Sequence, residues 1–381
     1  MSRQRALNAI NGIMGDRIPQ WDFPDNVLLA KEIAAYDIWE DTERTAVDLY
    51  RHFDIDMTHY IPGGIAEWNF PLVRYYNEAD YIENDDTKPY LKAYKKETVK
   101  PYRSMYDTLD MHCSASFWGM APTMAMKGYR FNSPEEVLAF NPLEKDHFTL
   151  AERTAFFQSY YKEKQELFGD SCLFMGWYYH TLFMWPVEIF GWENFMLAAL
   201  TDPERFKEIL DQFYAISKRD LTAMSAVEGL PLIGCHDDLC NANGPMFSPD
   251  WYREFIYDRY GELTSILHAA GKKALFVCDG NVVPLLDDVA ATGFDGISVD
   301  GNSDLRAITG RFSGKIIVGG MNPAVLSGGT FDQIEHMVKK TVAAVKEEPG
   351  YFFQCPGMNG KTPLKNVEHY QRCIRKYGQR S

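Results

Sequence analysis

Residues 271–300, GKKALFVCDGNVVPLLDDVAATGFDGISVD, contain two short apolar runs separated by a helical pattern. The runs span 274–278 and 296–299, and Gly293 ends the helical stretch between them. Strands of four to six residues that alternate with helices are typical of βαβ units, whose strands lie parallel. This stretch therefore predicts a parallel sheet covered by helices.

The same alternation continues on both sides of this stretch. Strands are predicted at 18–23, 56–61, 172–177, 230–235, 274–278, 296–299, 316–318 and 351–354. Helices are predicted at 149–168, 203–228, 249–270, 282–292, 331–346 and 365–377. A total that approaches eight strands favours a closed (β/α)8 barrel, a TIM barrel, over an open sheet. We expect one domain over 1–381, with an N-terminal elaboration and an irregular insertion at 65–145.

Composition and charge exclude several classes of protein. Lys plus Arg is 39 and Asp plus Glu is 53, so the net charge is −14. Nucleic acids and anionic membranes require clustered positive charge, which argues against both as partners. The N-terminus has no apolar signal region, and the most apolar stretch, 181–200, is interrupted by Pro186 and Glu188. We therefore expect a cytoplasmic protein.

The seven cysteines are scattered along the chain and never form a CxxC pair. An odd number without close pairs argues against a disulfide framework. Metal ligands and buried thiols remain the two interpretations. Nucleotide-binding versions of α/β folds receive little support, because neither GxGxxG nor GxxxxGK[ST] follows a strand.

Chemically active side chains follow the predicted strands at their carboxyl ends, where parallel barrels place their active sites. They are Trp177, Tyr178, Tyr179, His180, His236, Asp237, Asp238, Cys278, Asp279, Asp300, Met321, Asn322 and Cys355. Thiolates with imidazole or carboxylate suit zinc, and three protein ligands leave a fourth position open. The alternative is packing: buried cysteines, a core histidine at 180, and aspartates at 237–238 that cap a loop.

Several segments resemble the uroporphyrinogen decarboxylase superfamily, whose fold is a (β/α)8 barrel. They are RQRALNAINGIMGDRIP at 3–19, HDDLCNANGPMFSPDWYREF at 236–255, FVCDGN at 276–281, GFDGISVD at 293–300, IVGGMNPAVLSGGT at 317–330 and TPLKNV at 362–367. The true decarboxylase carries an R-Q-A-G-R-Y motif that grips tetrapyrrole carboxylates. Here the corresponding residues 20–24 are QWDFP. The chain is therefore more similar to the corrinoid-dependent methyltransferase branch.

That resemblance implies zinc on an H-x-C…C pattern. Cys278 matches the first cysteine and Cys355 lies at a similar distance to the second, but Phe276 occupies the position of the histidine. The third ligand must then come from another strand end, and His236 and Asp238 are the candidates, with Asp300 behind them. We predict Cys278, Cys355 and His236 as the metal site, with Asp238 and His180 as catalytic residues.

The resemblance also implies the reaction and its partners. Zinc activates a heteroatom, and a methyl group moves between a small donor, such as a methoxy-aromatic compound, and a corrinoid carrier protein or thiol. We predict that the substrate is contacted by Trp177, Tyr178, Tyr179 and Asp300. The cofactor is predicted to contact Met321 and Asn322. The chain is a possible homodimer. Two alternatives remain: a metal-free decarboxylase or lyase that uses Asp54 or Asp56 with a rim histidine, and a catalytically silent binding paralogue.

Overall fold

The computed structural model describes residues 2–24, 26–36, 41–59, 113–118, 121–126, 131–146, 148–358 and 362–380. Much of the expected insertion at 65–145 lies outside these residues, as do positions 60–61 of the strand expected at 56–61. The described parts of the insertion are the antiparallel pair β2 (Cys113–Trp118) and β3 (Ala121–Met126), the helix α6 (Pro134–Leu138) and the 3-10 turn η2 (Pro142–Glu144).

The central strands are all parallel, in the order β12-β11-β10-β9-β6-β5. They are β5 (Gly176–Tyr179), β6 (Leu232–His236), β9 (Lys273–Cys278), β10 (Gly296–Val299), β11 (Ile316–Gly319) and β12 (Tyr351–Phe352). Beside β5, the strand β1 (Met57–Thr58) pairs in parallel with β4 (Leu173–Phe174), which continues after one residue into β5. A small antiparallel pair, β7 (Cys240–Asn241) and β8 (Gly244–Pro245), follows β6.

An extended segment at 17–21 links the two ends of this row of strands. The carbonyl oxygen of Gln20 accepts the N–H of Met57 at 3.2 Å, so the segment adjoins β1. On its other side, Trp21 N donates to Phe353 O and Phe353 N donates to Pro19 O, both at 2.8 Å. Because these bonds join β1 to the end of β12, the hydrogen-bonded strands form the ring of a (β/α)8 barrel. The segment itself forms only isolated bridges, because Pro19 has no N–H to give to a ladder.

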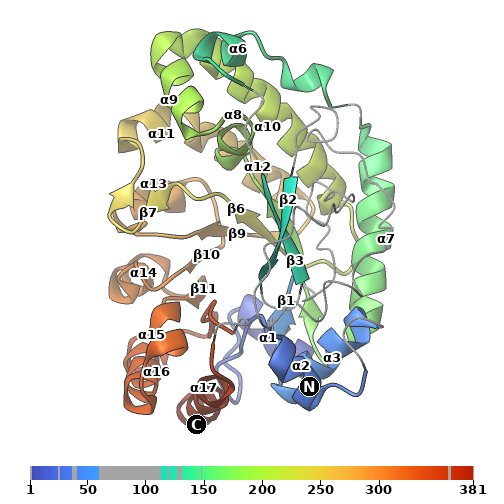
Figure 1. Cartoon of the computed structure of the whole chain (residues 1–381), viewed down its shortest axis with the longest axis vertical. Coiled ribbons are helices and arrows are strands. Elements are labelled where there is room, and N and C mark those ends of the chain that lie inside the picture. The colour runs from blue at the N-terminus through green and yellow to red at the C-terminus, as the bar shows by residue number, and fades with distance from the viewer. Residues whose placement is uncertain are drawn as a thin grey trace.

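Helices surround the strands (Figure 1). Those that follow or precede a strand of the ring are α3 (Thr42–His52), α7 (Leu150–Phe168), α10 (Pro203–Ser225), α12 (Tyr257–Ala269), α13 (Leu286–Ala291), α14 (Leu305–Phe312), α16 (Phe331–Val345) and α17 (Leu364–Tyr377). Additional ones are α1 (Ser2–Ile10), α2 (Val27–Ile33), α8 (Met184–Phe190), α9 (Trp192–Thr201), α11 (Pro249–Phe255), η3 (Val283–Leu285) and α15 (Pro323–Gly328).

Most predicted helices agree with the structure within a few residues, and two differ in their interior. The helix expected at 249–270 breaks at Ile256, whose φ of −127° separates α11 from α12. The helix expected at 282–292 begins as the 3-10 turn η3, which contains Pro284. The helix α14 was not predicted, because it is only eight residues long, although Leu305, Ile308 and Phe312 recur at helical spacing and are buried.

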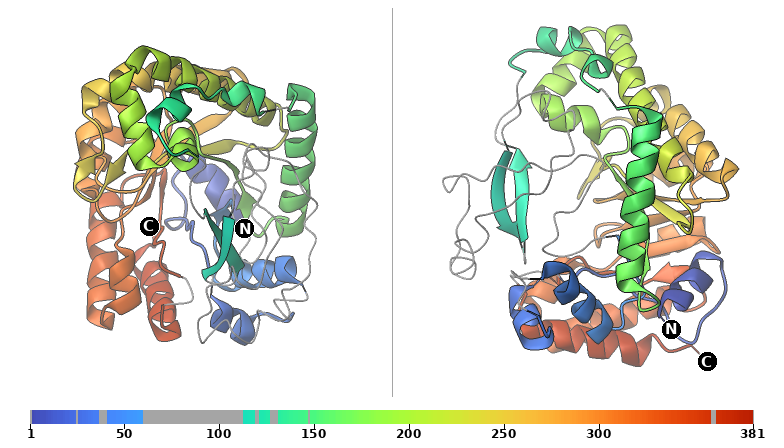
Figure 2. Two further views of the ribbon diagram at one scale, coloured as in Figure 1. Left: turned by 45° about the horizontal axis from the view of Figure 1, so that its top comes forward. Right: turned by 90° about the vertical axis from the view of Figure 1, so that its right-hand side faces the viewer.

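The core has two layers, because side chains of a strand point alternately to its two faces. On β9, Leu275 and Val277 belong to the cluster inside the ring, whereas Phe276 and Cys278 pack in the outer cluster, against the helices. The helix α1 covers the amino-terminal end of the strands, where Ile10 O accepts a 2.6 Å hydrogen bond from Lys273 Nζ. Both chain termini lie toward the same side of the molecule in the right-hand view of Figure 2.

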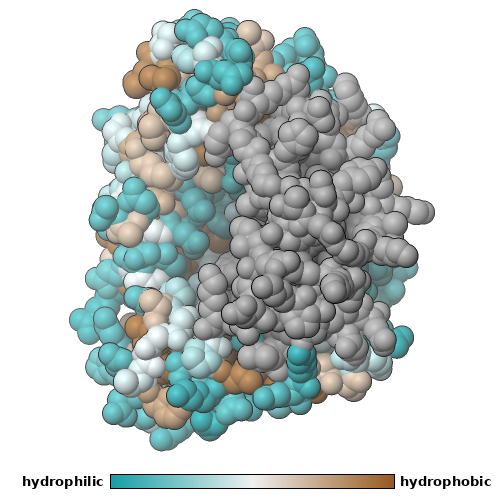
Figure 3. All heavy atoms as spheres, in the orientation of Figure 1, coloured by the Kyte–Doolittle hydropathy of each residue, from teal (hydrophilic) through white to brown (hydrophobic). Residues whose placement is uncertain are grey.

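The outer surface of the described residues carries no broad apolar face in the view of Figure 3, where hydrophobic residues are scattered among hydrophilic ones. Among the described helices, none is both long enough and apolar enough to cross a lipid bilayer.

Two glycines provide a paired test of the packing between β10 and β11. A Cβ on Gly296 would lie 2.5 Å from Ile316 Cβ and closer still to the carbonyl oxygen of Ile316. Gly296→Ala should therefore lower the free energy of unfolding by about 2–3 kcal/mol. Gly310→Ala, in the interior of α14 with nothing within 4 Å of the new methyl group, should raise it by about 0.5–1 kcal/mol. Urea unfolding measures both; equal effects would contradict the close pairing of β10 with β11.

Candidate active site

The strand β6 ends at His236, on the edge of the ring where all the parallel strands have their carboxyl ends. His236 Nε2 lies 3.1 Å from Asp238 Oδ1, and that same oxygen accepts the backbone N–H of Asp279 at 2.8 Å. Ligand atoms of His236, Asp238 and Asp279 all lie within 4.8 Å of one another. We call these three residues the rim group.

Charge and burial within the rim group perturb each of its members. Burial alone would lower the pKa of His236, but the Asp238 carboxylate outweighs it and raises that pKa. In return, His236 lowers the pKa of Asp238 against the opposing effect of burial. Burial and the nearby Asp238 raise the pKa of Asp279 to about 6. His236 Nδ1 is buried and has no hydrogen-bond partner among the described residues.

Aromatic rings wall the rim group on the side of the ring interior. The His236 ring meets Tyr179 edge-on at 4.4 Å and Trp177 at 5.4 Å, measured between centroids. His59, just after β1, stacks on Trp177 at 3.7 Å with an interplanar angle of 11°. Trp21 contacts both Trp177 and His59 edge-on. These side chains surround the rim group with apolar surface.

A second titratable pair lies beside this wall. His180 Nε2 is 3.6 Å from Glu188 Oε1, which α8 carries. Burial, followed by repulsion from His236, holds the pKa of His180 well below its usual value. Burial, followed by repulsion from Asp238, raises the pKa of Glu188 to about 7. Both shifts favour the neutral forms of this pair.

Asp237 has a structural role, but not as a cap of the loop that follows it, which was the alternative predicted from the sequence. Its carboxylate is fully buried and accepts backbone N–H groups from Leu182, Phe183 and Met184 at 2.6–2.8 Å. The hydroxyl of Tyr260 donates a fourth bond at 2.7 Å. Asp237 therefore anchors the start of α8 to the strand end that carries His236.

The two cysteines of the predicted metal site face away from the ring interior, Cys278 at the end of β9 and Cys355 three residues after β12. Cys278 and Cys355 are fully buried and belong to the outer cluster, between strands and helices. Burial, with Cys240 beside Cys278 and Asp22 beside Cys355, raises the pKa of both thiols well above the usual value. Among the described residues, neither thiol joins a group of potential ligands close enough to share one ion. The structure brings His236 together with Asp238, and not with the cysteines.

Tyr178 and Met321, expected to contact substrate and cofactor, also face the helices. Tyr178 is fully buried, and its hydroxyl lies 3.3 Å from Ser217 Oγ and 3.4 Å from Asp220 Oδ2, both on α10. Met321 is fully buried in the same outer cluster. Trp177 and Tyr179, in contrast, lie on the wall of the rim group.

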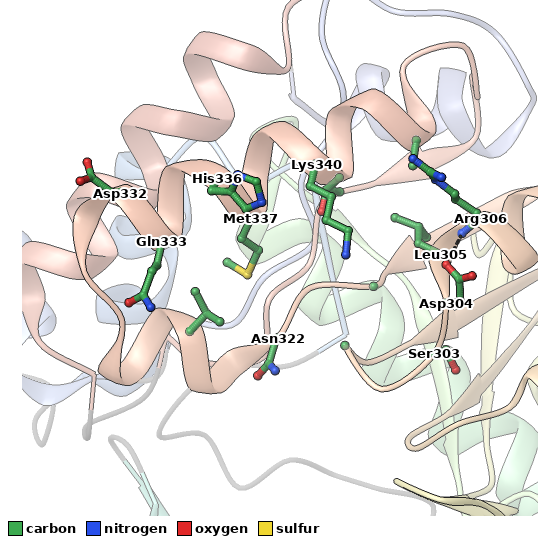
Figure 4. Close-up of a pocket in the computed structure, with 15 residues that line it drawn as sticks. Ser303, Asp304, Leu305, Arg306, Asn322, Asp332, Gln333, His336, Met337 and Lys340 are labelled. Carbon is green, nitrogen blue, oxygen red and sulfur yellow. Dashed lines mark hydrogen bonds between the residues drawn. The ribbon is translucent and has the colours of Figure 1, made fainter.

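Asp300 and Asn322 lie on the loops that follow β10 and β11. Asp300 accepts the N–H groups of Gly280 at 3.2 Å and Asn302 at 2.8 Å, which braces the loops after β9 and β10 against each other. Asn322 caps α15 through the N–H of Ala324. Asn322 also lines a pocket of about 700 Å³ between α14, α15 and α16, into which Lys340 points (Figure 4).

The carboxylates considered for a metal-free reaction lie at the opposite end of the ring. Asp56 precedes β1 and is fully buried, and Arg17 Nη2 lies 3.2 Å from its Oδ2 and 2.9 Å from Asp54 Oδ2. Arg5 also pairs with Asp56. These aspartates therefore belong to an ion-pair cluster at the amino-terminal end of the strands, away from the rim histidines.

Sequence reasoning gave no role to three residues of this region. Asp279 directly follows Cys278, and its position at a strand end was a usable signal. His59 lies inside the strand predicted at 56–61, whereas the observed strand β1 ends at Thr58, directly before it. Glu188 lies on α8, which the sequence analysis did not predict, and only the fold brings it to His180.

Comparisons with known proteins agree with this architecture. A family model described as uroporphyrinogen decarboxylase (URO-D) matches residues 186–377. The methylcobamide:CoM methyltransferase MtbA of Methanosarcina mazei is 31% identical over 129 residues, which cover 33% of this chain and 34% of that protein. A uroporphyrinogen decarboxylase of Pseudoalteromonas atlantica is 30% identical over 111 residues, 26% of this chain and 31% of that protein. The alignments thus span about a third of these relatives.

A solved structure matches over nearly the whole length. A methyltransferase from Methanosarcina mazei superposes with a TM-score of 0.61 and 17% sequence identity, covering 99% of this chain and 98% of that one. At this identity the match shows a shared fold. The expected barrel is confirmed by this match together with the parallel ring.

The clamp formed by Asp237 can be tested by removing its carboxylate. Asp237→Ala leaves three backbone N–H groups and the Tyr260 hydroxyl without their acceptor, and should lower the free energy of unfolding by about 3–5 kcal/mol. Asp304→Ala is the matched control, since that exposed side chain caps α14 through a single N–H, of Arg306; its cost should be about 0.5–2 kcal/mol. If chemical denaturation shows similar losses for both, the clamp does not hold α8.

Proposed function

The chain belongs to the uroporphyrinogen decarboxylase family, and on that premise we propose that it is a methyltransferase that transfers a methyl group between a small methylated donor and a corrinoid carrier or thiol acceptor. The observation that carries the proposal is the rim group, held at the carboxyl ends of the strands and walled by aromatic rings. The stretch shared with a methylcobamide:CoM methyltransferase supports the reaction class.

The donor set of the rim group fits a divalent metal ion such as zinc. One imidazole and two carboxylates are ligand types that zinc accepts, and three protein ligands leave a fourth position open. An ion held through His236 Nε2 would take the place of the 3.1 Å hydrogen bond between that atom and Asp238 Oδ1, which keeps both residues in one ligand set. When bound, zinc supplies Lewis acidity that activates the heteroatom of donor or acceptor.

Within this proposal, the rim group replaces the two-cysteine site as the preferred ligand set. To join His236, Cys278 and Cys355 would have to turn from the helix layer toward the rim. Asp238 holds the His236 ring through Nε2, and Asp279 adds the second carboxylate. The two-cysteine set remains the alternative that the metal analysis below decides.

The surrounding residues bind and orient the substrate. Trp177 and Tyr179 offer ring faces and edges to a small apolar methyl donor, such as a methoxy-aromatic compound, and exclude water from it. His180 and Glu188 form the proton-exchanging pair, because a carboxyl with a pKa of about 7 gains and loses a proton near neutral pH. Asp300 positions the neighbouring loops rather than the substrate.

The acceptor side of the reaction lies at the same edge of the barrel. A corrinoid held by a separate carrier protein would approach the carboxyl ends of the strands, where Asn322 and the loop of Asp300 lie. Asn322 is the better candidate for a contact, since Met321 is fully buried. The proposal is compatible with either a monomer or a homodimer. The cytoplasm is the expected location for a reaction between this chain and a corrinoid carrier protein.

Metal analysis with matched variants tests the proposal. We expect about one equivalent of rim-bound zinc and methyl transfer to cob(I)alamin from methoxylated or other methylated donors. His236→Ala and Asp279→Asn should lose that zinc and reduce the transfer rate at least ~100-fold. His336→Ala, a histidine of the pocket in Figure 4, should change neither.

The other outcomes are equally specific. Loss of zinc in Cys278→Ser/Cys355→Ser, with zinc retained in His236→Ala, would move the metal to the cysteines. Release of CO2 from a carboxylated substrate without metal would identify a decarboxylase. A folded protein that binds a corrinoid carrier but turns over no donor would be a silent paralogue.

A further inference from the structure

A second group of potential metal ligands lies between α16 and α17, apart from the rim group, with Cys373 buried and the other two members partly exposed. His369 and Cys373 are four residues apart on α17 and so share one face of that helix. Glu335 reaches them from α16, and one ligand atom of each residue lies within 4.8 Å of the others. We propose that these three residues bind a zinc-like transition-metal ion that joins the last two helices.

The distance between the thiol and the imidazole matches what tetrahedral zinc requires. Cys373 Sγ lies 3.5 Å from His369 Nε2. With Zn–S of about 2.3 Å, Zn–N of about 2.05 Å and a tetrahedral angle, two such ligands lie about 3.5 Å apart. The pair therefore has the spacing of two zinc ligands before any ion is added.

The carboxylate has one oxygen to spare for the ion. Glu335 Oε1 receives the ammonium of Lys339 at 2.7 Å and the hydroxyl of Tyr377. These two donors lower the pKa of Glu335 to about 2 and keep it ionised. Both of these bonds go to Glu335 Oε1, so Oε2 is available as a ligand while Oε1 keeps its supporting bonds.

Binding the ion requires two local changes, and in each of them every proton is accounted for. The Cys373 thiol gives up its proton to solvent, as cysteine does whenever it ligates a metal. The bond of His369 Nε2 to Phe331 O, 3.1 Å long, is exchanged for the metal, and the imidazole proton resides on Nδ1. The His369 ring already stacks on Phe331 at 4.5 Å, which holds its plane during the exchange.

An ion at this position would secure the helix that supports the closing segment of the barrel. Tyr370, next to His369 on α17, donates a 2.9 Å hydrogen bond to the buried carboxylate of Asp22. Asp22 in turn accepts the N–H of Cys355 at 2.6 Å. An ion that holds α17 against α16 therefore stabilises the contacts of Tyr370 and Cys355 with Asp22, next to the segment that closes the ring. We assign the site a structural role.

Cobalt substitution in a His236→Ala background tests this site alone, because that variant disables the rim group. We expect one equivalent of Co²⁺, with a thiolate-to-cobalt charge-transfer band and the visible bands of tetrahedral cobalt. Cys373→Ser should abolish the charge-transfer band, and His369→Gln should weaken binding at least tenfold. His336→Gln, an exposed histidine on α16, should leave affinity and spectrum unchanged.

Stability provides a second readout. In the same His236→Ala background, zinc at a hundredfold excess over its Kd should raise the thermal midpoint by roughly 2–4 °C, and Cys373→Ser should remove the shift. If the α17 variants fail to fold, Glu335→Gln tests the site instead, because that position is partly exposed. This variant should bind cobalt more weakly and keep the thiolate-to-cobalt band. A band that persists in Cys373→Ser, or no cobalt bound at millimolar concentration, would overturn the proposal.

Discussion

The backbone hydrogen bonds of the segment at 19–21 hold the barrel closed. Gln20 O joins this segment to β1, and the exchange between Trp21, Phe353 and Pro19 joins it to β12. The buried carboxylates of Asp56 and Asp22 both hold Gln20, the middle residue of the segment: Asp56 accepts its backbone N–H, and Asp22 accepts its side-chain amide. Without this closure, β1 and β12 would be open edges, and His59 would not be fixed beside Trp177.

Closure of the barrel also explains why the chemically active side chains lie together at one edge of the ring. All ring strands run the same way, so His236 after β6, Asp279 after β9 and Asp300 after β10 emerge at one edge. Asp237 then anchors α8 to that edge, which brings Glu188 to His180. The perturbed pKa values of Asp279 and Glu188 follow from the loss of hydration at the aromatic-walled rim and from repulsion by Asp238, which lies near both.

The sequence was sufficient to predict the alternation of strands and helices, because each strand is a short apolar run bounded by a glycine or a cap. It was not sufficient to decide which residue at each strand end faces the rim. On β6, Cys235 faces the helices and His236 the interior; on β9, the neighbour of His236 is Val277, which leaves Cys278 on the outer face. The register between neighbouring strands decides which of these side chains faces the rim. The sequence of a single strand does not reveal that register. His59 and Glu188 were missed for other reasons: the predicted strand at 56–61 ran past His59, whose partner Trp177 is far away in sequence, and Glu188 lies on α8, which was not predicted.

X-ray absorption at the zinc edge tests the rim group most directly. A Cys373→Ser/His369→Gln protein loaded with one equivalent of zinc lacks both the thiol and the imidazole of the site between α16 and α17, so neither contributes to the signal. We expect only nitrogen and oxygen scatterers, at about 2.0–2.2 Å, with the outer-shell pattern of one imidazole. Two sulfur scatterers at about 2.3 Å would contradict the rim group as the metal site and place the metal on Cys278 and Cys355.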